Sequence, residues 1–154
     1  MGTSDPMQGI FHGFDIAGAG LRAEMQRSEV VAANLSNMHL VGGKGRDPYR
    51  RRSVIFEEAL AAAQGSLHGV RGAAELAAGV RVKEVVEDRV TPFIEVHDPG
   101  HPLADERGIV KLSNVDMVRE MVDMSIIERS FQANLSAMRA YRTMVQDALA
   151  NLRS

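Results

Sequence analysis

The chain has 154 residues, of which 45% are hydrophobic and 25% are charged, as in one ordinary globular domain. Its formal net charge of -2 gives no overall electrostatic reason to bind nucleic acid or an anionic membrane. Because the sequence contains no cysteine, it excludes disulfides, thiolate metal sites and cysteine nucleophiles.

The first element that the sequence predicts is an amphipathic helix over residues 14–40. Residues 1–13 are expected to form a flexible segment, because four glycines between residues 9 and 20 weaken the first helical turns; each glycine costs up to about 1 kcal/mol relative to alanine. Steps of four and three residues along this helix define a seam, which is the spacing of a helix that packs along one side. The seam consists of Leu21, Met25, Ser28, Ala32 and Leu35.

The N-terminal part of the chain lacks the basic and then apolar leader of a cleavable signal peptide. No run anywhere in the sequence approaches the roughly 18 apolar residues of a membrane span. Direct insertion into a membrane is therefore not expected, and export would need a route other than a cleavable signal peptide.

Residues 41–112 are expected to form a loop and a small β-rich middle segment. The composition of residues 57–79, which are rich in alanine and glycine, is compatible with either a frayed helix or a mobile loop. Turn residues separate several short apolar runs that are typical of strands. These runs lie at residues 54–56, 80–86, 93–96 and 109–112.

The last predicted element is a long helix over residues 113–154, with a capping box at Ser113–Asp116. From Met117 onward, nine of the eleven positions at alternating steps of four and three are apolar. The two polar positions, Glu128 and Arg142, are interpreted equally well as solvent-exposed residues or as residues that fix the register of an interface.

About 35 residues at 1.5 Å each make the C-terminal helix roughly 50 Å long, more than a domain of this size can cover. The sequence therefore predicts a mainly α fold with a small β-rich insert. The long terminal helices are expected to pair as a coiled-coil-like hairpin. Because the C-terminal seam is the longer of the two, its uncovered part is expected to bind a neighbouring subunit.

Two clusters could instead indicate a binding site, and each has a simpler interpretation. His97, Asp98, His101 and Asp105 have metal-ligand side chains, but the prolines and glycine among them prevent a helix that would present both imidazoles to one ion. A turn in which Asp98 caps its own backbone is favoured. The glycine-rich loop at residues 42–45 lacks the spacing of a phosphate-binding loop. No metal, cofactor or active site is expected.

The only dense run of basic residues is accompanied by one aromatic residue, Tyr49. A charged face that meets an acidic neighbour is favoured over a nucleic-acid site, because the whole chain is slightly acidic. The basic residues are Lys44, Arg46, Arg50, Arg51 and Arg52.

Three motifs resemble the terminal segments of the bacterial flagellar axial proteins, the family of rod, hook and hook-associated subunits. They are FDIAGAGL at residues 14–21, ANLSN at 33–37 and SFQAN at 130–134. The middle of the chain is similar to the C-type (FlgC) proximal rod proteins in particular. This similarity lies in PYRR at residues 48–51, GVRV at 79–82, DPGHPLADERGIV at 98–110 and NVD at 114–116.

The resemblance implies a structural, non-enzymatic subunit of the proximal rod of the bacterial flagellar basal body. Such a subunit would self-assemble through its terminal helices into the drive shaft that transmits torque, and would form part of the export channel. The implied partners are further copies of the chain, other rod subunits, the base of the rod in the inner-membrane ring and the flagellar type III export apparatus. The implied location is the periplasm-spanning rod, reached without a cleavable signal peptide.

Two alternatives remain open at this stage. The chain could be another flagellar axial subunit, such as a B- or F-type rod protein, or a helical nucleic-acid-binding protein. In the rod interpretation, apolar interface residues bury the seam, and asparagine amides bind backbone or one another where helices meet. The expected interface residues are Leu21, Met25, Asn34, Leu35, Asn37, Met121, Met124, Phe131, Asn134, Leu135, Met138 and Val145.

Overall fold

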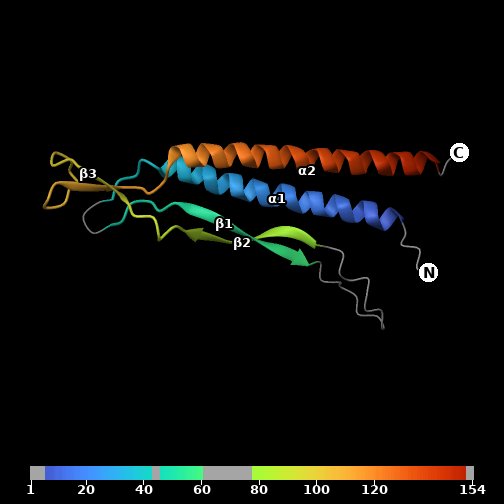
Figure 1. The fold of residues 1–154 in the computed structure, drawn as a ribbon, viewed down its shortest axis with the longest axis horizontal. Helices are drawn as coiled ribbons and strands as arrows, with labels where there is room; N and C mark the ends of the chain where they lie inside the picture. The colour runs from blue at the N-terminus through green and yellow to red at the C-terminus, as the bar shows by residue number, and fades with distance from the viewer. Residues whose placement is uncertain (1–5, 43–45, 61–77, 152–154) are drawn as a thin grey trace, which may run out of the picture. The chain divides into compact units, whose positions relative to one another are not determined.

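A computed structural model describes residues 6–42, 46–60 and 78–151 of the chain. In these residues a long helix lies near each end of the sequence, and the short strands come between the two helices in chain order (Figure 1). In chain order the elements are α1 (Pro6–Asn37), β1 (Arg52–Leu60), β2 (Ala78–Glu87), β3 (Ile94–His97), β4 (Ile109–Leu112) and α2 (Met117–Asn151). The expected mainly α chain with a small β insert is confirmed.

The strands lie where apolar runs predicted them. β4 has the predicted bounds, β3 is shifted by one residue, and β1 and β2 extend beyond the predicted runs. Residues 57–60 and 78–79 are therefore strand rather than frayed helix or loop. Residues 61–77, and residues 43–45 of the glycine-rich loop, lie outside the described part of the chain.

Helix α1 begins at Pro6, earlier than the expected start at Phe14. Its glycines lower helix propensity, but they also allow other side chains to approach the helix backbone closely. The phenol ring of Tyr141 lies where a Cβ of residue 13 would be, and the amide of Asn134 lies against Gly20. These close contacts explain why the helix includes glycines that were expected to weaken its first turns.

Helix α2 begins at Met117, and its N-cap is Asp116 rather than Ser113. The Oδ1 atom of Asp116 accepts hydrogen bonds from the backbone N–H groups of Val118 at 2.9 Å and Arg119 at 3.3 Å. Ser113 is buried, and its Oγ accepts from the Val115 N–H at 3.3 Å. The predicted capping box was therefore wrong by one helical turn, because Ser113 belongs to the buried segment before the helix.

The strands form two separate pairs, β1 with β2 and β3 with β4. β3 and β4 are antiparallel, with Ile94 opposite Leu112 and His97 opposite Ile109. On its other edge, β4 meets the segment after α1, where Val41 pairs with Leu112 and the Gly42 N–H donates to the Lys111 carbonyl at 2.9 Å.

The chain divides into two compact units. Unit 1 consists of Met1–Met25, Phe56–Lys83 and Glu128–Ser154, and unit 2 consists of Gln26–Ile55 and Glu84–Ile127. In unit 1 the buried side chains on α1 are small, at Ala17 and Ala23. A Cβ at residue 79 would lie 3.2 Å from the Cβ of Ala19, so the start of β2 also packs closely on this helix.

Unit 2 buries almost as many polar as apolar side chains in its described residues. The apolar members are Val31, Pro48, Val110, Val115 and Ile127, and the polar members are Asn34, Ser113, Asn114 and Glu120. Buried polar groups cost free energy unless they are hydrogen-bonded, so this core depends on how completely its polar atoms are satisfied.

Candidate functional site

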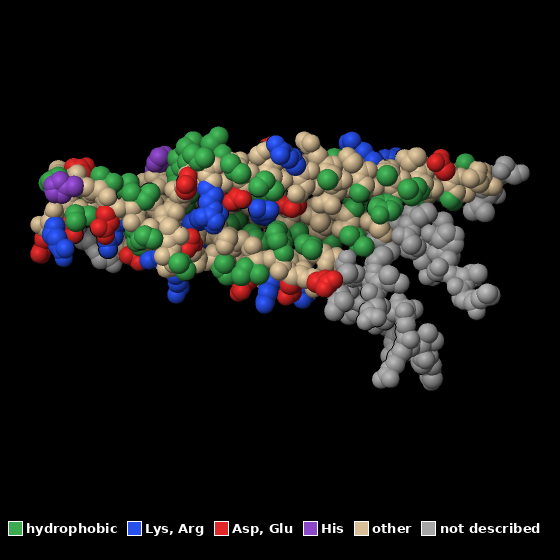
Figure 2. Space-filling view, viewed as in Figure 1, with side chains coloured by type: hydrophobic (Ala, Val, Ile, Leu, Met, Phe, Trp, Pro, Cys, Tyr) green, Lys and Arg blue, Asp and Glu red, His purple; other side chains and the backbone are tan. Residues whose placement is uncertain are grey.

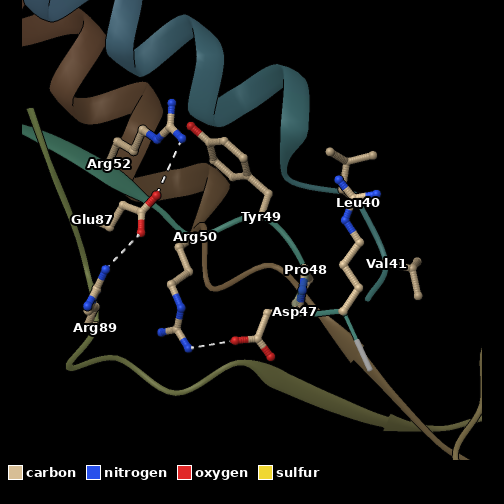
Figure 3. A pocket seen from close by; sticks show the side chains of 10 residues that line it. Leu40, Val41, Asp47, Pro48, Tyr49, Arg50, Arg52, Glu87 and Arg89 are labelled. Carbon is tan, nitrogen blue, oxygen red and sulfur yellow. Dashed lines mark hydrogen bonds and ion pairs between the residues drawn. The ribbon is translucent and has the colours of Figure 1, made fainter. Parts of the chain in front are cut away.

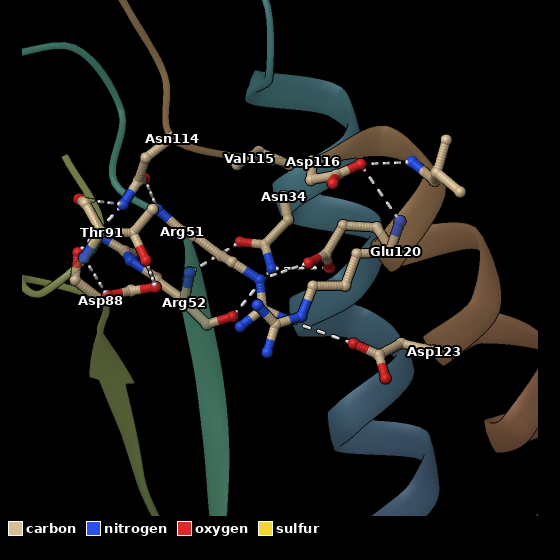
Figure 4. A network of polar contacts seen from close by, with 12 residues as sticks. Asn34, Arg51, Arg52, Asp88, Thr91, Asn114, Val115, Asp116, Glu120 and Asp123 are labelled. Carbon is tan, nitrogen blue, oxygen red and sulfur yellow. Dashed lines mark hydrogen bonds and ion pairs between the residues drawn. The ribbon is translucent and has the colours of Figure 1, made fainter. Parts of the chain in front are cut away.

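The amide of Asn34, on the last turns of α1, is the centre of the buried polar core (Figure 4). Its Nδ2 donates to the Arg52 carbonyl at 2.8 Å and to Glu120 Oε2 at 2.9 Å. Its Oδ1 accepts from the Tyr49 hydroxyl at 2.9 Å and from the Arg52 N–H at 2.9 Å. Both donors and both acceptor positions of the amide are therefore used within the chain.

Glu120, on the first turns of α2, has no exposed surface and uses both carboxylate oxygens. Oε2 accepts from Asn34, and Oε1 accepts from Arg51 Nε at 2.5 Å. The Arg51 side chain is 12% exposed, and its NH2 group also donates to Asp123 at 3.1 Å. A buried charge is tolerated when it is paired and hydrogen-bonded in this way.

Asn114 extends the same core to the segment after β2. Its Oδ1 accepts from the Arg51 N–H at 2.7 Å, and its Nδ2 donates to the carbonyls of Asp88 and Thr91, each at 3.1 Å. We name Asn34, Arg51, Asn114 and Glu120 the polar core. These four residues join the end of α1, the start of β1, the turn after β2 and the start of α2 (Figure 4).

Two ionisable groups beside the polar core have shifted pKa values. Hydrogen bonds from the backbone and side chain of Thr91 hold the pKa of Asp88 below its ordinary value of 3.8. Burial raises the pKa of the Tyr49 phenol above its ordinary value of 10.0, so the hydroxyl remains a proton donor to Asn34.

An apolar stripe is exposed on the first three turns of α2, whereas the side chains of the polar core are polar and mostly buried. Its side chains are 44% to 70% exposed, and they recur at positions one, four and five residues apart, which places them on one side of a helix. Figure 2 shows hydrophobic side chains gathered over the start of α2. The apolar stripe consists of Met117, Val118, Met121, Val122 and Ile126.

The rejected metal site is a turn, as predicted. Asp98 Oδ1 accepts from the Gly100 N–H at 3.2 Å, and His101 Nδ1 accepts from the Leu103 N–H at 3.1 Å. Asp105 Oδ1 accepts from two N–H groups, and that of Ile109 contributes most to lowering the pKa of Asp105. No group of three His, Asp or Glu side chains that could hold a metal ion occurs in residues 6–42, 46–60 and 78–151.

The basic run is divided between two environments. Arg51 belongs to the polar core, whereas Arg50 and Arg52 line a surface pocket and pair with carboxylates of the same chain, Asp47 at 3.5 Å and Glu87 at 3.4 Å (Figure 3).

Neither α1 nor α2, over its described residues, has the length of apolar sequence that a membrane span needs.

The C-terminal part of the chain, residues 106–152, matches the family model described as flagellar basal body rod FlgEFG protein C-terminal. The chain is also 40% identical over 136 residues to the flagellar basal-body rod protein FlgC of Escherichia coli O6:H1, an alignment that covers 88% of this chain and 92% of that protein. The chain belongs to the FlgC family. It is therefore a structural protein of the flagellar basal-body rod, and it is not an enzyme.

Other FlgC proteins align over a similar extent. The chain is 40% identical over 136 residues to FlgC of Salmonella typhimurium, with coverage of 88% and 92%, and 34% identical over 144 residues to FlgC of Bacillus subtilis, with coverage of 90% and 95%. The resemblance seen in the sequence motifs is thus confirmed over nearly the whole chain.

The FlgC-family chain places its expected interface residues in different environments. In unit 2, Asn34 is buried in the polar core, Asn37 donates to the Ala33 carbonyl of its own helix at 2.7 Å, and Leu35 and Met124 are half-buried. Met121 is 56% exposed in the apolar stripe. Asn34 and Asn37 therefore bind within the chain, whereas Met121 is exposed.

In unit 1 the same division applies. Met25 is 56% exposed and Phe131 is 38% exposed. The remaining expected interface residues are half-buried, and they are Leu21, Asn134, Leu135, Met138 and Val145. The Asn134 amide lies against Gly20, and the Met138 Cε would lie 3.6 Å from a Cβ at residue 18.

The polar core was not predicted from the sequence, and only Met117 and Met121 of the apolar stripe lie on the predicted seam. Glu120 stands among other charged residues, Asp116, Arg119 and Asp123, so the sequence offers no signal that it is the buried one. Val118, Val122 and Ile126 follow one another at steps of four, a signal adjacent to the seam that was recognised.

Proposed function

We propose that this chain is a subunit of the proximal rod that assembles, through its terminal helices, with further copies of itself and with other rod subunits. The assembled helices form part of the shaft that transmits torque and part of the export channel. Family membership supports a structural role in the rod, and the observation that carries the mode of assembly is the apolar stripe on α2.

The size of the stripe indicates what kind of assembly it can support. Full burial of one large apolar side chain contributes roughly 1.5 to 3 kcal/mol. Because these five side chains are about half exposed, covering them all contributes on the order of 5 kcal/mol. Association itself costs an estimated 4 to 15 kcal/mol. The stripe is therefore too small to hold an isolated pair of chains firmly, and it suits an assembly in which each subunit meets several neighbours.

The proposal includes a coiled-coil-like hairpin of α1 and α2. Contacts inside each unit support it. In unit 2, Ser28 Oγ lies 3.7 Å from Met124 Sδ, and Asn34, later in α1, binds Glu120, earlier in α2. In unit 1, Gly13 faces Tyr141 and Gly20 faces Asn134. Within each unit, a later residue of α1 therefore meets an earlier residue of α2, as antiparallel helices require.

The remaining partners follow from the same proposal. The base of the rod in the inner-membrane ring would bind the subunit in the completed structure, and the flagellar type III export apparatus would carry it there without a cleavable signal peptide. The placement of Arg50, Arg51 and Arg52, each paired with carboxylates of the chain, favours this protein-assembly function over nucleic-acid binding.

The decisive experiment replaces one exposed valine of the stripe by aspartate. Val122 is 54% exposed, so Val122→Asp leaves the isolated fold intact but places a charge in the proposed interface. Val90 is 95% exposed and lies outside both helices, so Val90→Asp is a control with the same chemical change. Leu135→Asp tests the helix seam as well, but Leu135 is half-buried and its replacement also perturbs folding.

Each variant replaces the chromosomal copy, and swimming and the presence of complete rods in isolated basal bodies are scored. We expect Val122→Asp to abolish both, and Val90→Asp to retain both. Circular dichroism of the purified proteins establishes that the variants are folded. Normal swimming of the Val122→Asp strain would show that the stripe is not an assembly surface.

A further inference from the structure

A pocket of about 850 Å³ opens on the surface of unit 2, between the end of α1, the start of β1 and the end of β2 (Figure 3). Four arginines line it, and only two carboxylates accompany them. The charged lining residues are Arg46, Arg50, Arg52, Arg89, Asp47 and Glu87. We name this the arginine pocket. We propose that it binds the acidic turn, residues 98–108, of a second copy of this chain.

Three of the four guanidinium groups of the arginine pocket are stacked or paired before any partner binds. Arg50 lies 4.1 Å from the centroid of the Phe93 ring, and Arg52 lies 5.6 Å from that of Tyr49. Arg52 and Arg89 share one carboxylate, Glu87, at 3.4 Å and 3.8 Å. Stacked and paired guanidinium groups lose less freedom on binding a carboxylate than free ones do.

The pocket has an excess of positive charge. Four arginines and two carboxylates give its lining a net charge of +2, whereas the whole chain has -2, so the rest of the chain carries -4. In the described part of the chain, no carboxylate pairs with the exposed Arg46. The pocket is therefore complementary in charge to other surfaces of the same protein.

The acidic turn has the charge and the rigidity that the pocket requires. Asp98, Asp105 and Glu106 against Arg107 give it a net charge of -2. The turn is closed by a hydrogen bond of 2.8 Å from the Asp98 N–H to the Gly108 carbonyl, and Asp105 accepts from the N–H groups that follow it. Glu106 is exposed at the end of this ordered turn, so its carboxylate can be presented at low entropic cost.

A second copy fits better than a polyanion. A pocket of about 850 Å³ is within the range of roughly 300 to 1,000 Å³ that encloses a small ligand or a few side chains. The net charge of +2 in the pocket lining matches the -2 of one acidic turn, whereas a nucleic acid needs a basic surface that continues along its backbone. A turn that enters the pocket of the next copy makes a head-to-tail contact, which closes into a ring or continues as a helix. The inference rests on the proposed rod function only for the setting in which copies meet.

The test uses the full chain in solution and reverses charges on each side of the contact. The pocket variant carries Arg46→Glu and Arg89→Glu, and the turn variant carries Glu106→Arg. Both change exposed side chains. Arg139→Glu, at an exposed position of α2 outside both surfaces, is the control. Sedimentation velocity is measured over a range of concentrations at low ionic strength and at about 1 M salt, where the Debye length is about 3 Å.

We expect the unaltered chain and the control to associate at low ionic strength and to dissociate at high salt. The pocket variant and the turn variant should each associate at least tenfold more weakly. An equimolar mixture of these two variants should associate more strongly than either variant alone, because the intact turn of one variant meets the intact pocket of the other, and the reversed charges also face opposite charges.

Three results would overturn the proposal: no salt-sensitive association of the unaltered chain, association of either variant as strong as that of the control, or a mixture that remains monomeric. These outcomes are distinct from a failure of the proposed rod function. Loss of the pocket contact leaves the effect of Val122→Asp on rod formation unchanged, and normal rods in the Val122→Asp strain leave the solution measurement unchanged.

Discussion

Replacing Glu120 by glutamine tests whether the polar core holds unit 2 together. The carboxylate accepts from Arg51 Nε at 2.5 Å through one oxygen and from Asn34 Nδ2 at 2.9 Å through the other. A glutamine of nearly the same shape keeps one oxygen and presents an NH2 group at the other position. Whichever way the glutamine amide is oriented, its NH2 group faces either the Arg51 Nε–H or the Asn34 NH2 group. Arg51 also loses its closest counter-charge.

The structure sets the size of the effect. Breaking a buried ion pair by removing one partner costs about 3 to 5 kcal/mol, and a hydrogen bond to a charged group contributes about 1.5 to 3 kcal/mol. Arg51 retains Asp123 at 3.1 Å and its side chain is 12% exposed, so part of its charge stays compensated. We therefore expect Glu120→Gln to lower the free energy of unfolding by about 3 kcal/mol, at the lower end of the range for a buried pair.

Urea unfolding followed by circular dichroism measures this loss, and a double-mutant cycle with Arg51→Met apportions it. The double variant should be about 1 to 3 kcal/mol more stable than the sum of the single effects predicts, since it has no unpaired arginine. Glu57→Gln is the matched control. Glu57 pairs with Arg81 at 2.6 Å, but the two side chains are 31% and 68% exposed. Exposed pairs contribute at most about 1 kcal/mol.

Equal losses for Glu120→Gln and Glu57→Gln would refute the reasoning, because burial would then make no difference to two ion pairs of similar length. Strict additivity in the cycle would also refute it. In that case Arg51 and Glu120 would stabilise the chain separately, without forming one unit.

Three further substitutions test single features of the chain. Gly42→Ala should lower the free energy of unfolding by about 1 to 3 kcal/mol, because the new Cβ would lie 2.8 Å from the backbone oxygen of Arg46, and urea unfolding measures this. Asp116→Ala removes the N-cap of α2 and should cost about 1 kcal/mol by the same assay. The pKa of Asp88 is lowered in the folded chain, so its ionised form stabilises the fold above pH 3.8, and this contribution is lost as pH falls through the folded pKa. Asp88→Asn should abolish that part of the acid dependence, measured as unfolding midpoints from neutral pH to below 3.8.

The helices and strands could be predicted from the sequence because each rests on a local pattern. The heptad spacing of α2 and the short apolar runs of β1 to β4 depend on residues close together in the chain. The bounds of the helices were less certain because they depend on distant residues. Pro6 begins α1 although glycines follow it, since other side chains, such as Tyr141, occupy the space that those glycines provide.

The polar core could not be predicted, since its members are far apart in sequence. Asn34 was expected from its motif to bind backbone or another amide where helices meet. Its Nδ2 donates to the Arg52 carbonyl at the start of the following strand and to the Glu120 carboxylate of α2. Arg51 was counted as part of a surface-charged run, although its partner Glu120 is 69 residues away. Neither charge has a local signal that distinguishes burial from exposure, because the distinction arises only when the partner is in place.

The seam of α2 shows that a helix can be predicted correctly while the prediction of its buried side is wrong. In unit 2 the predicted seam passes through Met117, Met121 and Met124, yet the fully buried residues are Glu120 and Ile127. Met124 of the seam is half-buried beside Ser28 of α1, whereas Met121 is exposed one position from the buried Glu120. The apolar residues of α2 therefore extend around more of the helix than the rest of the chain covers. A helix that needed only its own hairpin would gain nothing from apolar residues on the outer side, so the excess is best explained by contacts with a neighbouring subunit.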